Sequence, residues 1–300
     1  MKLLCMMLAL ACVASADTIN PYGVPSPGAF AMSTAGGWTG SGTGILNLDN
    51  RSLFPATDQV SVGLGVQSTS AAYQSIPGNN AAAQAIADVG IFKIAANYFD
   101  ATGGFHDHTE AIADAGWLDF YTISDATHTG QNGVLTFLVH ADGQFTGAGG
   151  ATWALGVSSN NALDFSTTEG ACDWRFVGSS PCPLNINSDY LVSVPFVFGT
   201  GFEMMIRSFT RAGLPSIGPS GPPNLGTDVN FLNTIYWAGI QSVKVGGQSI
   251  DGYSISAASG ADYTHSFAPV SAVPEPGAFG MLALGLVAIG YAARTRRSSS

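Results

Sequence analysis

Apolar and polar residues alternate with a period of two along much of this chain, which is the pattern of β-strands that bury one face. Residues 59–66 show it most strictly, with Val or Leu at every second position and small or polar residues between them. Further strands are predicted where the same alternation, or a short apolar run, is bounded by Gly, Asn, Asp, Ser or Pro. These strands are 42–48, 91–99, 117–123, 151–157, 173–177, 190–198, 202–209 and 231–237.

Two dipeptides predict tight turns that join neighbouring strands. Asp142-Gly143 separates residues 133–141 from 144–149, and Gly246-Gly247 precedes a strand predicted at 248–255. Asp-Gly and Gly-Gly reach the positive φ values that two-residue hairpin loops need. Both dipeptides are therefore expected to close antiparallel hairpins.

A single segment, 80–88, predicts a helix, because Asn80 is a good N-cap and residues 81–85 are Ala and Gln. About a dozen strands and no parallel strand–helix–strand unit predict an all-β fold, an antiparallel β-sandwich of jelly-roll-like type. The Pro- and Gly-rich run at 215–223 is interpreted as a long loop inside this sandwich. A linker between two modules is the alternative, but the three or four strands that follow are too few for a separate core.

The first 16 residues have the pattern of a secretory signal peptide. Lys2 precedes an apolar stretch at 3–13, and Ala14 and Ala16 are the small residues that signal peptidase reads. Cleavage is therefore expected before Asp17, which places the body of the protein outside the cytoplasm.

The last 28 residues combine a Pro-rich tetrapeptide, an apolar run and a basic end. Residues 277–293 are 17 consecutive apolar residues, roughly 25 Å of helix at about 1.5 Å per residue, near the short limit for spanning a bilayer. The arginines that follow are expected to stay on the cytoplasmic side. The residues that define the segment are Val273, Pro274, Glu275, Pro276, Arg294, Arg296 and Arg297. For the helix and arginines alone, an ordinary C-terminal anchor is the alternative.

This order of Val-Pro-Glu-Pro, one helix and an Arg cluster resembles the PEP-CTERM sorting signal of bacterial exported proteins. The resemblance covers about a tenth of the chain. It implies that an exosortase removes the tail from a membrane-anchored precursor, and that the protein reaches the cell surface or an extracellular matrix of exopolysaccharide and biofilm. The expected organisation is a signal peptide at 1–16, a β-sandwich body at 17–272 and a sorting signal at 273–300, with its transmembrane helix at 277–293. Exosortase, signal peptidase and the membrane are the partners expected during export.

Composition limits the partners of the body. Charged residues are 10% of the chain, against a usual ~25%, while 46% of residues are hydrophobic, which excludes a disordered body. Residues 17–272 hold six basic and 19 acidic residues, a formal net charge of −13. Nucleic acid and anionic membrane surfaces are poor partners for such a charge, whereas neutral sugars and cations remain open.

Two cysteines remain after removal of the signal peptide, and they are expected to form a disulfide. Cys172 and Cys182 flank a Gly-Ser-Ser-Pro turn region, and a bridge there would contribute ~3 kcal/mol in the chain-entropy model. Two buried thiols or a metal-binding pair are the alternatives, although no His lies nearby. A lipid-modified Cys12 is disfavoured by the order of residues in Ala9-Leu10-Ala11.

The sequence offers few catalytic or metal-binding residues. His106, His108 and Glu110 would share one face of an extended segment, but no fourth ligand accompanies them and a Gly-rich stretch precedes them. No metal and no cofactor are therefore predicted. Glu203, on the strand face opposite Phe202, is the candidate for a glycosidase that uses two carboxylates.

No nucleophile elbow, phosphate loop or dinucleotide motif is present. No catalytic residue is predicted, and the chain is expected to be a non-enzymatic structural or carbohydrate-associated matrix protein; the alternative is a secreted glycoside hydrolase. Aromatic side chains could stack on sugars, although at least three of the five tryptophans are expected in the core. These are Trp38, Trp117, Trp153, Trp174 and Trp237, accompanied by Tyr236, Tyr253 and Tyr263.

Overall fold

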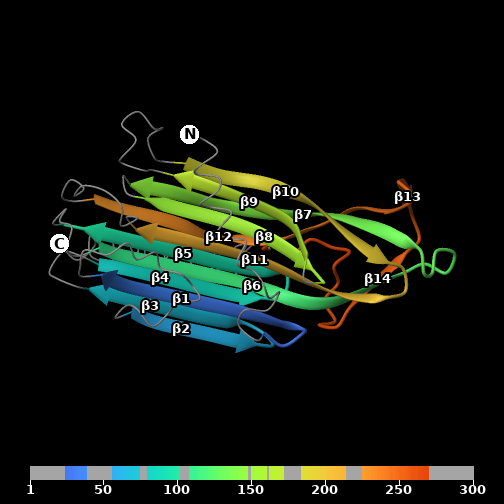
Figure 1. The fold of residues 1–300 in the computed structure, drawn as a ribbon, viewed down its shortest axis with the longest axis horizontal. Helices are drawn as coiled ribbons and strands as arrows, with labels where there is room; N and C mark the ends of the chain where they lie inside the picture. Colours follow the sequence, from blue (N-terminus) through green and yellow to red (C-terminus); the bar gives the residue numbers. More distant parts are fainter. Residues whose placement is uncertain are drawn as a thin grey trace, which may run out of the picture. The chain divides into compact units, whose positions relative to one another are not determined.

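The computed structural model describes residues 24–38, 56–74, 80–101, 108–147, 150–160, 162–171, 184–213 and 225–269. The regular elements in these ranges are all β-strands (Figure 1). The chain divides into two compact units, Met1–Phe267 and Ala268–Ser300, and the strands belong to the first. The signal peptide, both cysteines of the predicted disulfide and the sorting signal lie outside the described residues. No helix in the described ranges is long and apolar enough to cross a membrane, and the span predicted at 277–293 lies outside them.

The strands form two antiparallel sheets, which we call sheet A and sheet B. The order in sheet A is β2 (Ala56–Gly63), β1 (Gly28–Trp38), β6 (His108–Ser124), β11 (Gly201–Gly213), β8 (Ala151–Ser159) and β9 (Ala162–Ala171), with β14 (Ser254–Ala257) paired to β6. The order in sheet B is β10 (Leu184–Val197), β7 (Asn132–Gly147), β12 (Leu225–Val245), β5 (Ile91–Asp100), β4 (Asn80–Asp88) and β3 (Gln67–Gln74), with β13 (Gln248–Ile250) paired to β12.

A two-stranded ribbon passes from one sheet to the other, as in a jelly roll. β6 pairs with β11 in sheet A, and their continuations β7 and β10 pair with each other in sheet B. The β6–β7 and β10–β11 connections are joined by backbone hydrogen bonds where they pass from one sheet to the other. Gly130 N donates to Phe198 O (2.9 Å), and Phe198 N donates to Gln131 O (3.0 Å). The predicted all-β, jelly-roll-like antiparallel sandwich is confirmed.

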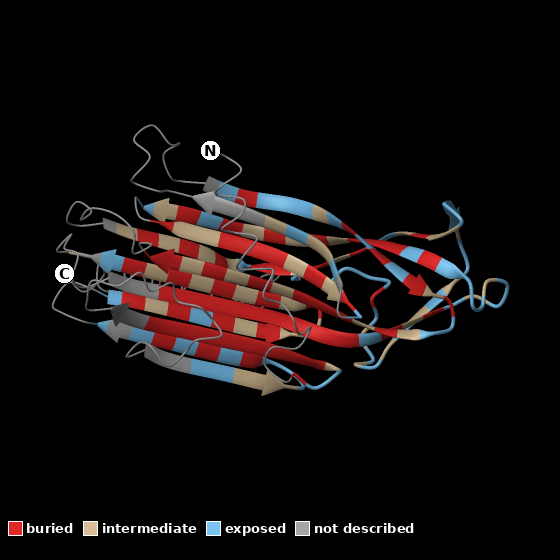
Figure 2. Cartoon of the chain, in the orientation of Figure 1, coloured by how far each residue is buried: buried red, intermediate tan, exposed pale blue. Residues whose placement is uncertain are grey.

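The core between the sheets is filled by residues from alternating positions, which appear as buried stripes along the strands (Figure 2). Aromatic pairs fill one part of it: the Trp153 and Phe231 rings stack at 4.7 Å, and the Phe137 and Trp237 rings at 4.3 Å. Burying each such side chain contributes roughly 1.5–3 kcal/mol relative to leaving it in water. Trp153 belongs to sheet A and Phe231 to sheet B, so their contact joins the two sheets, whereas Phe137 and Trp237 join β7 to β12 within sheet B.

Alanine fills another part of the core, and this overturns the helix predicted at 80–88. The segment is strand β4, in which every second residue is buried. Cα atoms of β4 lie within 8 Å of β1 and β6 in the opposite sheet, closer than the usual ~10 Å between packed sheets. Only small side chains fit such a gap. The helix propensity of alanine, a few tenths of a kcal/mol per residue, is outweighed by this packing.

The turn predicted at Asp142-Gly143 is also wrong. Both residues lie inside β7, which runs unbroken from Asn132 to Gly147. Gly143 faces the core, where an added Cβ would lie 2.3 Å from Cδ1 of Phe231. Glycine is required here for the close approach of an aromatic ring rather than for a reversal of the chain.

The turn predicted at Gly246-Gly247 is confirmed. The two glycines have φ values of 54° and 83°, and Val245 pairs with Gln248 across them. The period-two run at 59–66 is only partly strand, because β2 ends at Gly63. Predicted strands that fall on observed ones are 91–99, 117–123, 151–157, 190–198, 202–209 and 231–237. The strands predicted at 42–48 and 173–177 lie outside the described residues.

Residues 258–267, which we call the closing segment, fasten the end of the body onto both sheets. Ser259 donates to Asp119 through its backbone N (3.1 Å) and its Oγ, and Tyr263 Oη donates to Asp119 Oδ2 (3.0 Å). Trp237 Nε1 in turn donates to Tyr263 O (3.0 Å). Asp119, Tyr263 and Trp237 are all buried, so Tyr263 belongs to the core and anchors the closing segment, whose other residues are exposed or half-buried.

Candidate functional site

The outer face of sheet B carries a row of three polar and aromatic side chains across strands β10, β7 and β12. Asp189 pairs with His140, and His140 pairs with Tyr236, so the three lie side by side on one face. His140 Nδ1 lies 2.8 Å from Asp189 Oδ1, and the rings of His140 and Tyr236 are 4.9 Å apart at 32°. We call Asp189, His140 and Tyr236 the ring row.

Alternation in β7 explains why the ring row points outward. Val139 and Ala141 are fully buried in the core, so His140 between them faces away from it. His140 and Tyr236 are half-buried, whereas Asp189 is exposed. His140 is therefore a partly buried imidazole on a strand, with Asp189 as its partner.

Polar and apolar rows flank the ring row on the same face. Residues on its apolar side are Leu138 and Leu191, which pair with each other, and the Leu191 side chain is 57% exposed. Residues on its polar side are Asp142, Asn187, Gln144, Asn185 and Asn230, which follow in the next two rows of pairs. We call these seven residues and the ring row together the outer polar face.

A bulge in β12 adjoins this face. Between Asn230 and Thr234 the register against β7 advances only from Gln144 to Asp142, so β12 holds extra residues there. Thr234 has a φ of 149°, rare for a non-glycine residue, and Asn233 is exposed. Bulges occur preferentially where a sheet redirects side chains at a functional site.

The environment of Tyr236 stabilises the neutral form of its phenol. Burial raises the pKa of Tyr236, and the carboxylates of Asp189 and then Asp142 raise that pKa further. Burial alone raises the pKa of Asp228, which lies along β12 beyond Asn230. The face therefore presents a neutral phenol among carboxylates, which suits a ligand that donates hydrogen bonds.

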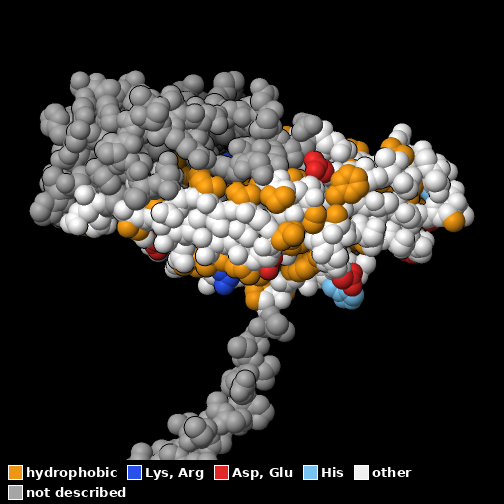
Figure 3. Space-filling view, turned by 90° about the horizontal axis from the view of Figure 1, so that it is seen from below, with side chains coloured by type: hydrophobic (Ala, Val, Ile, Leu, Met, Phe, Trp, Pro, Cys, Tyr) orange, Lys and Arg blue, Asp and Glu red, His pale blue; other side chains and the backbone are white. Residues whose placement is uncertain are grey.

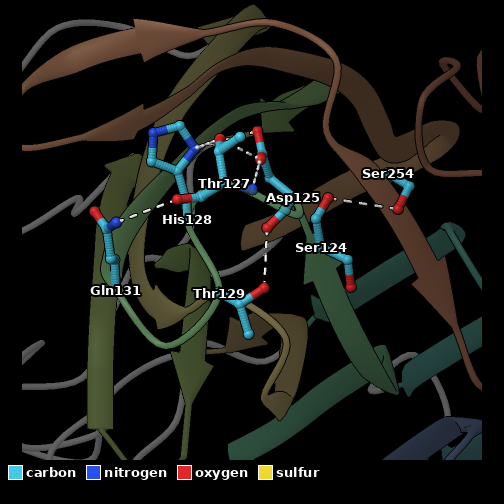
Figure 4. Close-up of polar contacts among 7 residues, drawn as sticks. All are labelled: Ser124, Asp125, Thr127, His128, Thr129, Gln131 and Ser254. Carbon is cyan, nitrogen blue, oxygen red and sulfur yellow. Dashed lines mark hydrogen bonds and ion pairs between the residues drawn. The ribbon is translucent and has the colours of Figure 1, made fainter.

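Two turns with the same sequence pattern, Asp-x-Thr-His, hold His128 and His265. In the first, Asp125 Oδ1 accepts from N and Oγ1 of Thr127 (both 2.7 Å), and His128 Nδ1 lies 3.2 Å from Asp125 Oδ2 (Figure 4). Gln131 Nε2 donates to Thr127 O (3.4 Å) in the same loop. These bonds, those of Thr127 first, lower the pKa of Asp125.

The second turn repeats this geometry in the closing segment. Asp262 Oδ1 accepts from N (3.0 Å) and Oγ1 (2.5 Å) of Thr264, and His265 Nδ1 lies 2.8 Å from Asp262 Oδ2. Bonds from Thr264, and then from His265, lower the pKa of Asp262. Because each His is satisfied within its own turn, these pairs stabilise loops.

The absence of a metal at His106, His108 and Glu110 remains a prediction, because the structure does not test it. His106 lies outside the described residues, and β6 begins at His108; the side chains of His108 and Glu110 lie outside the description. In the described part of the chain, no three His, Cys, Asp or Glu side chains are grouped so that they could hold a metal ion.

Glu203 lies on the outer face of sheet A. Phe202 is buried in the core, so the prediction that Glu203 faces the other way is confirmed. Arg207, four residues along on the same face, makes a bidentate ion pair with buried Asp114, at 3.0 Å from Nε to Oδ1 and 2.6 Å from an Nη atom to Oδ2. This ion pair links β11 to β6.

Three tryptophans lie in the core, as predicted. Trp117, Trp153 and Trp237 have no exposed surface, whereas the side chains of Trp38 and Trp174 lie outside the description. The described surface seen in Figure 3 consists mostly of uncharged groups with isolated charged side chains.

Sequence reasoning missed the ring row as a unit. Asp189 and Tyr236 lie 49 and 96 residues from His140 in the chain, and only strand register brings them together. The sequence signal that could have indicated the ring row is a polar or aromatic residue at an outward-facing position in each of the strands β10, β7 and β12.

Comparison with known proteins identifies the C-terminal segment. Residues 272–297 match the PEP-CTERM protein-sorting motif. No curated protein matches the chain. Two solved structures of infectious bursal disease virus, from the Gt and Gx strains, align at 10% identity each with TM-scores of 0.13 and 0.15. The alignments cover 72% and 77% of this chain and 62% and 63% of the viral chains, less than two thirds of their length. Scores this low support no inference about fold or function.

Proposed function

We propose that this exported protein, which carries a PEP-CTERM sorting motif, is a non-enzymatic surface or matrix protein that associates with the exopolysaccharide of its producer. The observation that carries the proposal is the motif at 272–297, which indicates an exported precursor, membrane-anchored and processed by an exosortase. All seven residues predicted for the sorting signal, from Val273 to Arg297, fall within this match.

The chemistry of the body supports a role in binding. The outer polar face spreads one phenol, one imidazole, carboxylates and amides over three adjacent strands. Such a surface offers flat rings and many hydrogen-bond acceptors, which suit a hydroxyl-rich polymer. The net charge of −13 over residues 17–272 keeps the protein soluble and disfavours anionic surfaces.

Fractionation of the producing cells tests the proposal. Wild-type cells are expected to hold the protein in the extracellular matrix fraction, where it co-purifies with polysaccharide and is released when the polymer is digested. Cells that lack the exosortase should retain it in the membrane fraction. Recovery of the protein as a free species in the medium would contradict the proposal, and so would turnover of the polysaccharide by the purified protein.

A further inference from the structure

We propose that the outer polar face of sheet B is a binding site for a neutral, hydroxyl-rich polysaccharide, with Tyr236 and His140 as the stacking platform. This inference rests on the proposed function for the source of the polymer, and it adds the site and the class of sugar. Neither residue belongs to the core or to the Asp-x-Thr-His turns.

The two rings pack against each other as one aromatic unit. Their centroids are 4.9 Å apart and their planes are tilted by 32°, too close for rings that lie edge to edge, so they stack with an offset and a pyranose ring can pack only against the outer, exposed part of the pair. Leu191, exposed in the adjacent row, extends the apolar area. A sugar ring presents C–H groups on its faces and hydroxyls at its edge, and amphipathic aromatic rings suit this combination.

Asp189 fixes the platform and supplies acceptors. Its Oδ1 lies 2.8 Å from His140 Nδ1, which sets the orientation of the imidazole, while the Asp189 side chain is 55% exposed. A carboxylate has about four acceptor positions, so the contact with His140 leaves capacity for sugar hydroxyls. The platform is thus held in place before a ligand arrives, which lowers the entropy cost of binding.

Further polar groups continue along the strands from the platform. On β7, Asp142 and Gln144 follow His140 at two-residue steps, roughly 7 Å each at ~3.4 Å per residue. Asn230 of β12 pairs with Gln144, and exposed Asn233 lies in the bulge that follows Asn230 along β12. Acceptors and amide donors therefore recur along a line, as the binding of successive sugar units requires.

The negative charge of the strands of sheet B favours a neutral polymer as the ligand. The strands of sheet B contain Asp88, Asp100, Asp142, Asp189 and Asp228, against Lys93 and Lys244 as their only lysines and no arginine. Three of these carboxylates lie on or beside the outer polar face, and the body as a whole is acidic. A polyuronate or a sulfated polymer would be repelled, whereas hydroxyl groups donate to carboxylates without that cost.

Affinity electrophoresis of the protein purified from its host, with the producer's extracellular polysaccharide separated by anion exchange into neutral and acidic pools, tests the site. The neutral pool should retard the wild-type protein, and Tyr236→Ala should weaken this binding at least about tenfold. Asp189→Ala, at an exposed position that should not affect folding, should also weaken it. Tyr253→Ala, which changes a half-buried tyrosine outside the face, is the matched control and should bind as wild type does.

The possible outcomes separate this site from the proposed function. Equal binding by the wild type, Tyr236→Ala and Asp189→Ala would overturn the site and leave the proposed function standing. Binding of the acidic pool alone would overturn the choice of a neutral polymer. Failure of the wild-type protein to bind either pool would overturn both proposals. Thermal unfolding of each variant shows whether a loss of binding reflects a loss of fold, and Tyr236→Phe, which keeps the ring, should restore most of the affinity.

Discussion

At the scale of single residues, Asp119 is the polar group on which the core depends most. It is fully buried and accepts hydrogen bonds from Phe120 N, Ser259 and Tyr263. Removal of the carboxylate would leave several buried donors without acceptors, each at a cost of about 1–3 kcal/mol.

Asp119→Ala is therefore expected to lower the free energy of unfolding by about 3–5 kcal/mol. Urea unfolding monitored by tryptophan fluorescence measures this, because Trp237 reports on the closing segment. Ser256→Ala, at an exposed position of β14, should change the stability by less than about 0.5 kcal/mol. A similarly small change for Asp119→Ala would show that the closing segment is held by other contacts.

Two buried tyrosines predict how stability depends on alkaline pH. Burial raises the pKa of Tyr121, and it raises that of Tyr263 as well, with Asp119 adding to both shifts. Because the folded state keeps these phenols neutral, their contribution to stability is complete below pH ~10, the usual tyrosine pKa, and is lost as pH rises above it. Tyrosine ionisation measured by ultraviolet absorbance should therefore coincide with unfolding measured by circular dichroism for these two residues. Ionisation of every tyrosine in a protein that stays folded would contradict this expectation.

At the scale of the elements, alternation predicted the strands whose buried positions hold large side chains, such as β5, β8 and β11. It failed in β4, where the buried positions hold alanine, since apolar residues also occupy outward positions such as Ala82 and Ile86 and the composition favoured a helix. The turn predicted at Asp142-Gly143 was wrong for another reason. Glycine is required there because the ring of Phe231, 88 residues away in the sequence, approaches the backbone closely. The ring row could not be predicted because strand register depends on contacts across the whole sandwich.

The close approach of the sheets at β4 gives a test of this explanation. Ala85 has no exposed surface and lies where Cα atoms of facing strands come within 8 Å. Ala85→Leu should lower the free energy of unfolding by about 1–3 kcal/mol through overpacking. Gln84→Leu, on the exposed face of the same strand, is the control and should be nearly neutral. Chemical denaturation of both variants measures the difference in the free energy of unfolding. Equal stability of the two variants would mean that the sheets can move apart at this position with little loss of stability.

At the scale of the whole molecule, the sorting signal makes the C-terminus a site of processing. Mature protein from the native host should lack residues 277–300, and Glu275→Ala should leave a longer, membrane-held form. Proline has no backbone N–H and favours an extended backbone, so we expect the enzyme to read the glutamate between Pro274 and Pro276 in an extended peptide. C-terminal mass mapping of wild type and variant measures this, whereas a plain anchor would tolerate the substitution. A wild-type protein that still ends at Ser300, in a host with the exosortase, would refute the prediction.

The closing segment also sets the order in which export and folding can be completed. Only four residues separate Phe267 from the start of the sorting motif at residue 272, yet Tyr263 occupies the core beside Trp237 and Asp119. A chain that crosses the membrane with its N-terminus first delivers these donors and this ring last. Until then the carboxylate and the indole lack their partners, and the sandwich cannot reach its full stability. We therefore expect the body to complete its fold only after residues 258–267 have crossed, and a chain stalled earlier to stay open to extracytoplasmic proteases.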